Sequence, residues 1–275
     1  MLRLRCTTYH YPAARGPALH DLELAVPHGA VVGLVGPNEA GKSTLCLVAA
    51  GLAPSVTGGA LDGLLEIDGE AMTGRPPFEV AQRVGLGLAD PQGQLSGITG
   101  TVFEEIGLGP MNLGLPADET VRRVEAAAAA VGIERLLLRS PTGLSGGETQ
   151  LVAISSLLAM EPRHLILDEP TSQLDPLGAR LVAEALHRLA HSGMALLIAE
   201  HRTDLLDGLC DRVAVIEAGT IIAEGPADET LSDPRLAGLG VAPPSRYRLA
   251  RACARAGLAV DPADLGQALG GWPHR

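Results

Sequence analysis

The chain has 275 residues, of which 46% are hydrophobic and 2% aromatic, and its formal net charge is −11. This length suits one large α/β domain with a small extension, and the core must be filled mainly by Leu, Val, Ile and Ala. The acidic balance argues against a nucleic-acid-binding surface, because phosphate contacts need clustered cations. No run of about 18 apolar residues is present, so no membrane-spanning helix is expected.

The first predicted elements are antiparallel strands at 2–8 and 20–26, where apolar and polar residues alternate. Between them lies the segment Tyr9-His10-Tyr11-Pro12, followed by a turn rich in Gly, Pro and Ala. Tyr11 could stack on an adenine face, as aromatic residues do on nucleic-acid bases. The alternative for Tyr11 is packing at the strand end, and that alternative is favoured for Tyr9.

The segment Gly36-Pro37-Asn38-Glu39-Ala40-Gly41-Lys42-Ser43-Thr44 has the pattern G-x-x-x-x-G-K-[ST]. It follows the apolar run 30–35, which predicts a buried strand, and precedes 45–50, which predicts the start of a buried helix. This strand–loop–helix context is the one that a phosphate-binding loop requires. Backbone N–H groups and the helix N-terminus would face a polyphosphate. Lys42 would reach the terminal phosphates and Ser43 would hold Mg²⁺.

Lys42 is the single lysine among the 21 Lys and Arg residues of the chain. Arginine carries a planar, branched guanidinium that is too bulky for a compact phosphate nest, whereas an ammonium is a point charge that fits it. The only lysine of the chain therefore occupies the position where an arginine would be too bulky to bind the phosphates.

The remaining pattern predicts an α/β framework interrupted by a helical insertion. Further strands are expected at 64–67 and 84–88, helices at 101–108, 118–131 (capped by Asp118) and 133–138, and then helix 147–160, strand 164–168, helix 176–191, strand 194–200, helix 203–208, strands 212–217 and 220–224, and tail helices 246–256 and 263–269. This alternation predicts a parallel sheet covered on both faces. The four cysteines show neither metal-ligand spacing nor a disulfide framework, which predicts a reducing, cytoplasmic compartment, with Cys46 a buried thiol.

Two carboxylates, Asp168 and Glu169, follow the apolar run Leu165–Leu167. Because strand ends in such sheets face the ligand crevice, Asp168 suits Mg²⁺ coordination and Glu169 is placed to polarise a water molecule. His201 ends the predicted strand at 194–200 and could contact a γ-phosphate at the same crevice. A structural role is the more common one for a lone histidine.

A second anion site is indicated at Leu144-Ser145-Gly146-Gly147-Glu148, which opens the helix 147–160. A simple glycine turn that caps the helix is the alternative. A chain with one nucleotide loop has no evident use for this second site, unless it serves a phosphate bound to another subunit.

In this order, these residues resemble the nucleotide-binding subunit of an ABC transporter. The resemblance covers roughly residues 2–235 and rests on Tyr11, the 36–44 loop, Leu144–Glu148, Asp168-Glu169, Ser172–Asp175 and His201. It implies the P-loop NTPase fold, a mostly parallel sheet with an antiparallel β subdomain and an inserted helical subdomain at about 92–142. It also implies an ATPase domain at 1–240 and a short helical extension at 241–275.

The resemblance implies ATP and Mg²⁺ as cofactors, with Glu169 as general base and His201 as the γ-phosphate contact. ATP would be held by Tyr11, Gly36, Pro37, Asn38, Glu39, Ala40, Gly41, Lys42, Ser43 and Thr44, and Mg²⁺ by Ser43 and Asp168. Ser145, Gly146 and Gly147 would close the site of a second ATPase subunit, identical or not, and Asp175 would couple the two sites.

A narrower resemblance lies at 89–115 and in the tail 240–244, which are similar to the ATPases of energy-coupling-factor importers of vitamins and transition-metal ions. It implies an integral membrane transporter subunit as partner and a peripheral location at the cytoplasmic face of the membrane. Apolar residues such as Leu95, Ile98, Phe103 and Ile106 would lie near the groove for a membrane-subunit helix, or else belong to the core.

The sequence departs from the family at three positions. Ala89 stands where the family usually has Gln, Glu39 replaces a usual Gly, and Glu148 replaces a usual Gln. Gln92 and Gln94 are the two candidates for the missing role, but Gln94 has its own matching place in the subgroup pattern. The two added carboxylates should weaken polyphosphate binding unless they point outward. The alternatives kept open are a soluble ABC-type ATPase of DNA repair or translation and a weakly hydrolysing regulatory partner.

Overall fold

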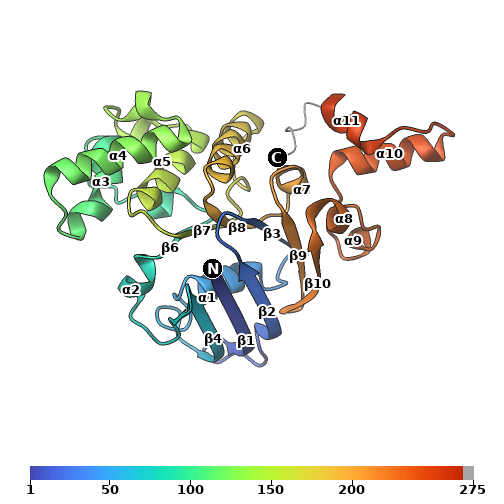
Figure 1. Cartoon of the computed structure of the whole chain (residues 1–275), viewed down its shortest axis with the longest axis horizontal. Coiled ribbons are helices and arrows are strands. Elements are labelled where there is room, and N and C mark those ends of the chain that lie inside the picture. Colours follow the sequence, from blue (N-terminus) through green and yellow to red (C-terminus); the bar gives the residue numbers. More distant parts are fainter. Residues whose placement is uncertain (269–275) are drawn as a thin grey trace.

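The computed structural model describes residues 1–268 and builds them into two sheets with helices around them (Figure 1). The smaller sheet has the order β2-β1-β4-β5 and is antiparallel, with β1 at Leu2–His10, β2 at Leu19–Val26, β4 at Ala60–Ile67 and β5 at Glu70–Ala71. The predicted antiparallel pair at 2–8 and 20–26 is confirmed, and both strands are longer than predicted.

The larger sheet has the order β10-β9-β3-β8-β7-β6, and its strands are parallel except for β10. Its strands are β3 at Val31–Val35, β6 at Val84–Gly87, β7 at His164–Asp168, β8 at Ala195–Ala199, β9 at Arg212–Glu217 and β10 at Thr220–Pro226. Every residue of β3, β6, β7 and β8 is buried, as expected for parallel strands covered on both faces. The predicted α/β fold class, with its parallel and antiparallel sheets, is confirmed.

The helices fall into three groups. Around the sheet lie α1 (Lys42–Ala49), α2 (Pro77–Ala81), α6 (Pro176–His191) and α7 (Thr203–Leu206). Three mutually packed helices, called here the helical subdomain, are α3 (Val102–Asn112), α4 (Ala117–Val131) and α5 (Gly146–Leu158). The predicted bounds of about 92–142 left out α5 and stay a prediction. The C-terminal part contains α8 (Ala227–Leu231), α9 (Arg235–Gly238), α10 (Ser245–Arg255) and α11 (Pro262–Ala268), and α10 and α11 extend away from the rest of the molecule (Figure 1).

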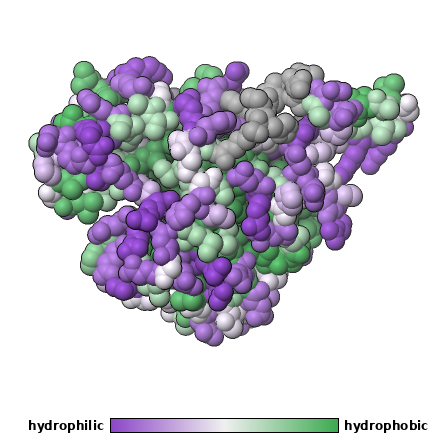
Figure 2. All heavy atoms as spheres, in the orientation of Figure 1, coloured by the Kyte–Doolittle hydropathy of each residue, from purple (hydrophilic) through white to green (hydrophobic). Residues whose placement is uncertain are grey.

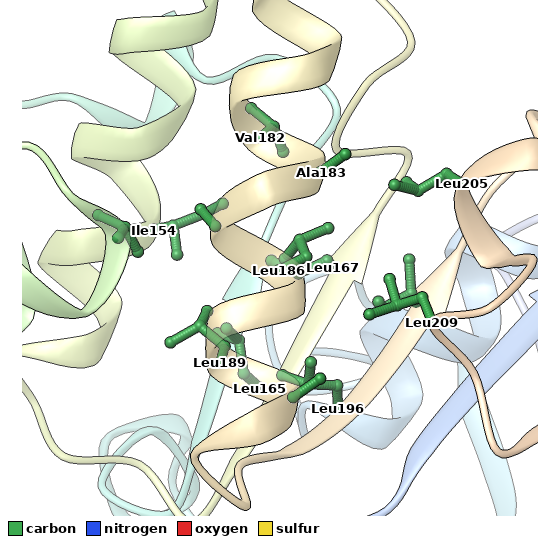
Figure 3. Packing of buried hydrophobic residues seen from close by; sticks show 14 of the residues in the cluster. Ile154, Leu165, Leu167, Val182, Ala183, Leu186, Leu189, Leu196, Leu205 and Leu209 are labelled. Atoms are coloured by element: carbon green, nitrogen blue, oxygen red, sulfur yellow. The ribbon is translucent and has the colours of Figure 1, made fainter. Parts of the chain in front are cut away.

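One continuous core joins the helical subdomain to the larger sheet. On α6, Val182, Leu186 and Leu189 are buried against α5 and the strands below it, among Ile154, Leu165 and Leu196 (Figure 3). Burying each such side chain contributes about 1.5–3 kcal/mol. The α5–α6 contact therefore fixes the start of α5 relative to the ends of β7 and β8.

Three sequence predictions need correction. Asp118 does not cap α4, because the cap position is Pro116 and Asp118 lies in the first turn. The helix predicted at 133–138 is only a 3₁₀ turn at Glu134–Leu136, since Ile133 and Leu136 are both held in the core. Helix α3 continues through Pro110 to Asn112, past the predicted end at 108; the residue before this proline is Gly109, which has no Cβ to clash with the ring. The short elements α2, β5, α8 and α9 were not predicted.

The C-terminal helix α10 docks through a buried guanidinium. Arg246 is 7% exposed and donates to Asp207 at 2.6 and 2.7 Å and to Asp228 at 2.6 Å. A buried charge is tolerated when it is paired and hydrogen-bonded in this way. Helices were predicted at 246–256 and 263–269; residue 269 lies outside the described residues. The boundary between 240 and 241 stays a prediction.

The visible surface mixes hydrophilic and hydrophobic residues, with apolar groups gathered on the helical subdomain and on the projecting C-terminal part (Figure 2). Met111 and Leu113 at the end of α3 and Leu258 after α10 are among the exposed large apolar side chains. Within residues 1–268, none of the helices combines the length and the apolar character needed to cross a membrane.

Candidate functional site: a nucleotide-binding cleft

The candidate site lies at the edge of the larger sheet where β3, β7 and β8 end. These strands are parallel neighbours, and Asp168 at the end of β7 pairs in register with Ala199 of β8. The 36–44 loop follows β3, the carboxylates Asp168 and Glu169 end β7, and Glu200 and His201 follow β8. The topology therefore brings three separate sequence motifs to one place, as is typical of ligand crevices in α/β sheets.

A cleft of about 530 Å³ opens at this edge. It is lined by Tyr11, Pro17, Ala18, Asn38, Glu39, Gly41, Lys42, Ser43, Thr44, Glu169, His201 and Ala218. Most of the residues predicted to hold ATP and to act on it therefore surround one cleft. Tyr11 reaches it from the end of β1, donates or accepts a hydrogen bond with the Thr44 hydroxyl at 3.2 Å, and meets the ring of Tyr9 edge-on at 5.0 Å. Tyr9 itself is fully buried, as its alternative assignment predicted.

The loop from 36 to 44 has the backbone that the motif demands. A Cβ on Gly36 would lie 2.2 Å from the carbonyl oxygen of Ile216 in β9, so only glycine fits there. Gly41 has φ of +104° and directly precedes α1. Glu39 also has a positive φ, 62°, which is the region that glycine adopts without strain. The family's usual Gly at this position thus has a structural reason, and Glu39 retains the backbone conformation at a cost.

Lys42 is nearly buried and folds back onto its own loop. Its Nζ donates to the carbonyl oxygens of Gly36 at 3.0 Å and Pro37 at 2.9 Å. Burial lowers the pKa of Lys42 below its usual value, and the carboxylates of Glu169 and Asp168 oppose that shift. The side chain is a cation held in the loop by carbonyl oxygens, which a phosphate could replace.

Asp168 is a buried carboxylate at the end of β7. Burial raises its pKa, and a hydrogen bond from Ser43 opposes the rise. Its Oδ1 atom is buried and has no hydrogen-bond partner among the described residues. An unsatisfied buried oxygen is costly, and oxygen ligands from Asp and Ser suit Mg²⁺. These two residues fit a magnesium ion.

Glu169 is strained and paired. Its φ is 50°, an uncommon value for a residue with a side chain, and its N–H donates to Ala199 at 2.8 Å. One carboxylate oxygen lies 2.6 Å from Nε2 of His201. The backbone conformation and this contact direct the carboxylate into the cleft beside the phosphate loop.

Glu200 is a residue that the sequence reasoning missed. It is 1% exposed and accepts hydrogen bonds from Thr171 Oγ1 at 2.8 Å and from the backbone N–H groups of His201 at 2.9 Å and Arg202 at 3.2 Å. These donors compensate a buried carboxylate and fix the turn that carries His201. The sequence signal that could have revealed it is an acidic residue, Glu200, directly after the apolar strand Ala195–Ala199, as Glu169 follows β7.

The predicted second anion site lies elsewhere in the chain. Ser145 caps α5 by accepting from the Glu148 N–H, and the Glu148 carboxylate accepts from the Ser145 N–H at 3.1 Å. Asp175 caps α6 by accepting from Gly178 N–H at 2.7 Å. Neither Ser145, Gly146, Gly147 nor Asp175 lines the phosphate-loop cleft. Ser145 and Gly146 are exposed instead.

Comparison with known proteins then decides the family. A protein-family model described as ABC transporter matches residues 19–172, from β2 to just beyond Glu169. The chain belongs to the ABC transporter family. Its part in that family is the ATP-binding ATPase domain, and this agrees with the resemblance on which the sequence prediction rested.

Curated relatives in this ABC family are similar over most of the chain. It is 42% identical to the cobalt import ATP-binding protein CbiO of Rhodobacter capsulatus, over 93% of this chain and 89% of that protein. It is 37% identical to the energy-coupling factor transporter ATP-binding protein EcfA of Methanosarcina acetivorans, over 94% and 92%. A putative ABC transporter ATP-binding protein from the same organism is 38% identical over 91% of this chain, but the chain spans only 41% of that relative's length.

Solved structures share the ABC cassette fold. CbiO1 of Clostridium perfringens, part of the transporter complex CbiONQ, is similar with a TM-score of 0.74 and 29% identity, covering 86% of this chain and 92% of that one. A nucleotide-free ATP-binding cassette from an ABC transporter gives a TM-score of 0.73 at 26% identity, covering 88% and 98%.

The structure shows the surroundings of two departures from the ABC pattern, Ala89 and Glu148. Ala89 follows β6, and neither nearby glutamine lines the nucleotide cleft: Gln94 is bonded to Leu86 O and Leu88 N, and Gln92 is exposed. Glu148 is held by the Ser145 cap and by Arg135 at 3.0 Å and Arg139 at 3.6 Å. The N–H of Ser145 lowers the pKa of Glu148, so its charge is balanced within the subdomain.

Proposed function

We propose that this chain hydrolyses ATP to energise a membrane transporter of the energy-coupling-factor type, an importer of a vitamin or a transition-metal ion. The single observation that carries the proposal is the meeting of Lys42, Asp168 and the Glu169–His201 pair at the ends of three parallel strands. The relatives named CbiO and EcfA, and the motif similarity at 89–115, support the importer class.

ATP would lie in the cleft with its phosphates on the 36–44 loop. Lys42 would exchange the carbonyl oxygens of Gly36 and Pro37 for phosphate oxygens, and the ring of Tyr11 would stack on the adenine. Mg²⁺, when bound, would be held by Ser43 and Asp168 and would neutralise charge that develops on the phosphates. The unpartnered Oδ1 of Asp168 supports this ligand assignment.

Hydrolysis would proceed by in-line attack of water on the γ-phosphorus, with cleavage of the bond to the β-phosphate oxygen. Glu169 would accept the proton of that water. His201 would keep the Glu169 carboxylate oriented from 2.6 Å and would itself contact the γ-phosphate, while Glu200 fixes the turn beneath it. These are roles for Glu169 and His201 as catalytic residues and for Glu200 as a positioning residue.

A second ATPase subunit would complete the site. Ser145, Gly146 and Gly147 of one subunit would close over the ATP held by the phosphate loop of the other, and Asp175 would couple the two sites. The exposure of Ser145 and Gly146 away from the chain's own cleft supports this arrangement. The partner would be a second copy or a related ATPase.

The transporter subunit would dock on the helical subdomain, which would hold the chain at the cytoplasmic face of the membrane. Of the four apolar residues considered for this groove, Ile98 is 83% exposed, whereas Ile106 is fully buried and belongs to the core. Leu95 and Phe103 are partly buried against the core. Ile98 is therefore the residue of the four that is available to a partner.

The second candidate function is that of a weakly hydrolysing regulatory partner. It is favoured by Ala89, because the family usually has an amide there and neither Gln92 nor Gln94 lines the cleft. In that case the partner subunit would carry most of the turnover.

A Glu169→Gln variant tests the proposal. With ATP and Mg²⁺ it should form a stable dimer in size-exclusion chromatography, and its turnover should fall by about 10²–10⁴-fold, the usual range for a general base. Glu125→Gln, at an exposed position of α4, is the matched control and should behave like the original chain. Unchanged turnover in Glu169→Gln would refute the catalytic assignment; negligible turnover of the original chain together with an ATP-dependent dimer would favour the regulatory alternative.

A further inference from the structure

A second cluster of ligand-type side chains lies at the opposite edge of the larger sheet from the nucleotide cleft. His28 lies in the turn between β2 and β3, Asp68 in the turn between β4 and β5, and His164 is the first residue of β7. The three residues are far apart in the sequence and come from both sheets. The fold therefore assembles this cluster, and no local motif predicts it.

The cluster has the dimensions of a metal site. One ligand atom from each residue can be chosen so that all lie within 4.8 Å of one another. Nε2 of His28 is 2.7 Å from Oδ1 of Asp68, and the rings of His28 and His164 have centroids 5.3 Å apart. Small side-chain movements would bring the three atoms around one ion.

His164 points to a missing ligand. Its side chain is 1% exposed, and neither ring nitrogen has a hydrogen-bond partner among the described residues. Buried polar groups in folded proteins are nearly always partnered, so an imidazole with two unsatisfied nitrogens needs an explanation.

We propose that His28, Asp68 and His164 bind a divalent transition-metal ion such as Co²⁺, Ni²⁺ or Zn²⁺. Two imidazole nitrogens and one carboxylate oxygen suit these ions, whereas Mg²⁺ and Ca²⁺ prefer oxygen ligands alone. This site is separate from the magnesium site at Ser43 and Asp168 and does not depend on the proposed transport function.

Other cations already gather at the cluster. The amino group of Met1 lies 2.5 Å from Asp68 Oδ1 and 2.5 Å from His28 Nε2, and Arg163 lies 2.8 Å from Asp68 Oδ2. The amino group therefore stands where the metal ion would contact Asp68 and His28. Met1 is 44% exposed, so an ion can displace it into solvent, while Arg163 keeps the other carboxylate oxygen.

Metal binding here would tie the antiparallel sheet to β7. That strand begins with His164 and ends with Asp168, so one five-residue strand carries a ligand of each site at its two ends. Because the ligands come together only in the folded chain, bound metal should raise the melting temperature.

Titration of the nucleotide-free chain with Co²⁺ in excess Mg²⁺, followed by calorimetry and visible absorption, tests the proposal. We expect one Co²⁺ per chain and a rise in melting temperature. His28→Gln changes an exposed residue, so it should leave the fold intact, and it should weaken Co²⁺ binding by more than about tenfold. Asp68→Asn should likewise weaken Co²⁺ binding by more than about tenfold.

His191→Gln, at an exposed histidine near the end of α6, is the matched control and should bind Co²⁺ like the original chain. Absence of stoichiometric binding would overturn the proposal and leave the cluster as an ion-pair centre for Met1 and Arg163. Binding that survives both His28→Gln and Asp68→Asn would overturn it as well. Loss of binding in the histidine control would assign the ion to another surface.

Discussion

The phosphate-loop cleft and the start of α5 are the two halves of the proposed ATP site, and their local chemistry is opposite. In the cleft, Glu39 and Glu169 have positive φ values of 62° and 50°, Oδ1 of Asp168 has no partner among the described residues, and Lys42 occupies carbonyl oxygens of its own loop. At the start of α5, the Ser145–Glu148 capping box and the Asp175 cap of α6 leave the neighbouring helix ends satisfied.

This difference indicates that ligand binding should affect the two halves of the proposed site differently. Strain and unpaired buried groups are stabilised only by surrounding structure or by ligand, and they gather where a ligand acts. The cleft therefore gains most from ATP and Mg²⁺. The start of α5 is a rigid surface: a Cβ on Gly147 would lie 2.6 Å from Cα of Gly178, so the two helix N-termini are in close contact. In the proposed dimer it would therefore need little rearrangement to contact a nucleotide held by the partner.

The largest effect is expected at Lys42. Lys42→Ala should weaken ATP binding by about 10- to 150-fold, because the loop loses its one cation and a hydrogen bond to a charged group contributes roughly 1.5–3 kcal/mol. Lys42→Arg should lose nearly as much despite keeping the charge, since the ammonium is held between the carbonyl oxygens of Gly36 and Pro37, in a space that suits a point charge better than a planar guanidinium. Nucleotide titration by calorimetry measures both. Near-normal binding by Lys42→Arg would contradict the view that the cleft, unlike α5, is fitted to a point charge.

Ser145→Ala should separate the two halves. Loss of the cap should destabilise the chain by about 1 kcal/mol, and in the Glu169→Gln background it should also impair ATP-dependent dimer formation. Thr101→Ala is a matched control, because Thr101 and Glu104 form the same capping box at α3. It should lose similar stability and still form the dimer, as judged by chemical denaturation and size-exclusion chromatography. If both variants lost the dimer equally, Ser145 would act only as a helix cap and would have no separate role in dimer formation.

Glu39→Gly should relieve part of the strain in the cleft. Glycine adopts the left-handed conformation freely, so the variant should be more stable by about 1 kcal/mol. Removing an exposed carboxylate that lines the cleft should also tighten ATP binding by about two- to fivefold, the scale of an exposed charge interaction. Glu39→Gln is the control: it should share the gain in affinity without the gain in stability. Thermal melts measure the stability and ATP titrations the affinity. A Glu39→Gly variant that was no more stable than the original chain would contradict the presence of backbone strain at this position.

Much of the candidate site was predictable because its motifs are local. The 36–44 loop, the Asp168-Glu169 pair and His201 each lie directly after an apolar strand, and the alternation of strands and helices brings parallel strand ends to one edge. The helix at 176–191 and the strand at 164–168 were predicted at their observed boundaries, since long periodic or strongly apolar segments give clear signals.

The rest depends on contacts that no local pattern reveals. Glu200 is held by Thr171 and by the backbone N–H groups of the turn that carries His201. The 3₁₀ turn at Glu134–Leu136 replaces a predicted helix, because Ile133 and Leu136 are both held by the core. The left-handed backbone at Glu39 is likewise a property of the loop as folded. The His28–Asp68–His164 cluster joins two turns and the first residue of β7, which spacing in the sequence does not show.

The smallest effect is expected for Glu148→Gln at the α5 half. Glutamine keeps the capping box, so only the ion pairs with Arg135 and Arg139 are lost, and because both arginines are exposed the cost should be about 0.5 kcal/mol at neutral pH. The pKa of Glu148 is lowered by the N–H of Ser145, so the charge contributes stability above 4.5, its ordinary value, and that stability is lost as pH falls through the lowered pKa. The stability difference between Glu148→Gln and the original chain should therefore shrink towards zero in acid, as measured by urea unfolding over a pH series. A stability difference that grew in acid, or one as large as that of Ser145→Ala, would contradict this prediction. It would show that the start of α5 depends on the Glu148 carboxylate and is not stabilised by the capping hydrogen bonds alone.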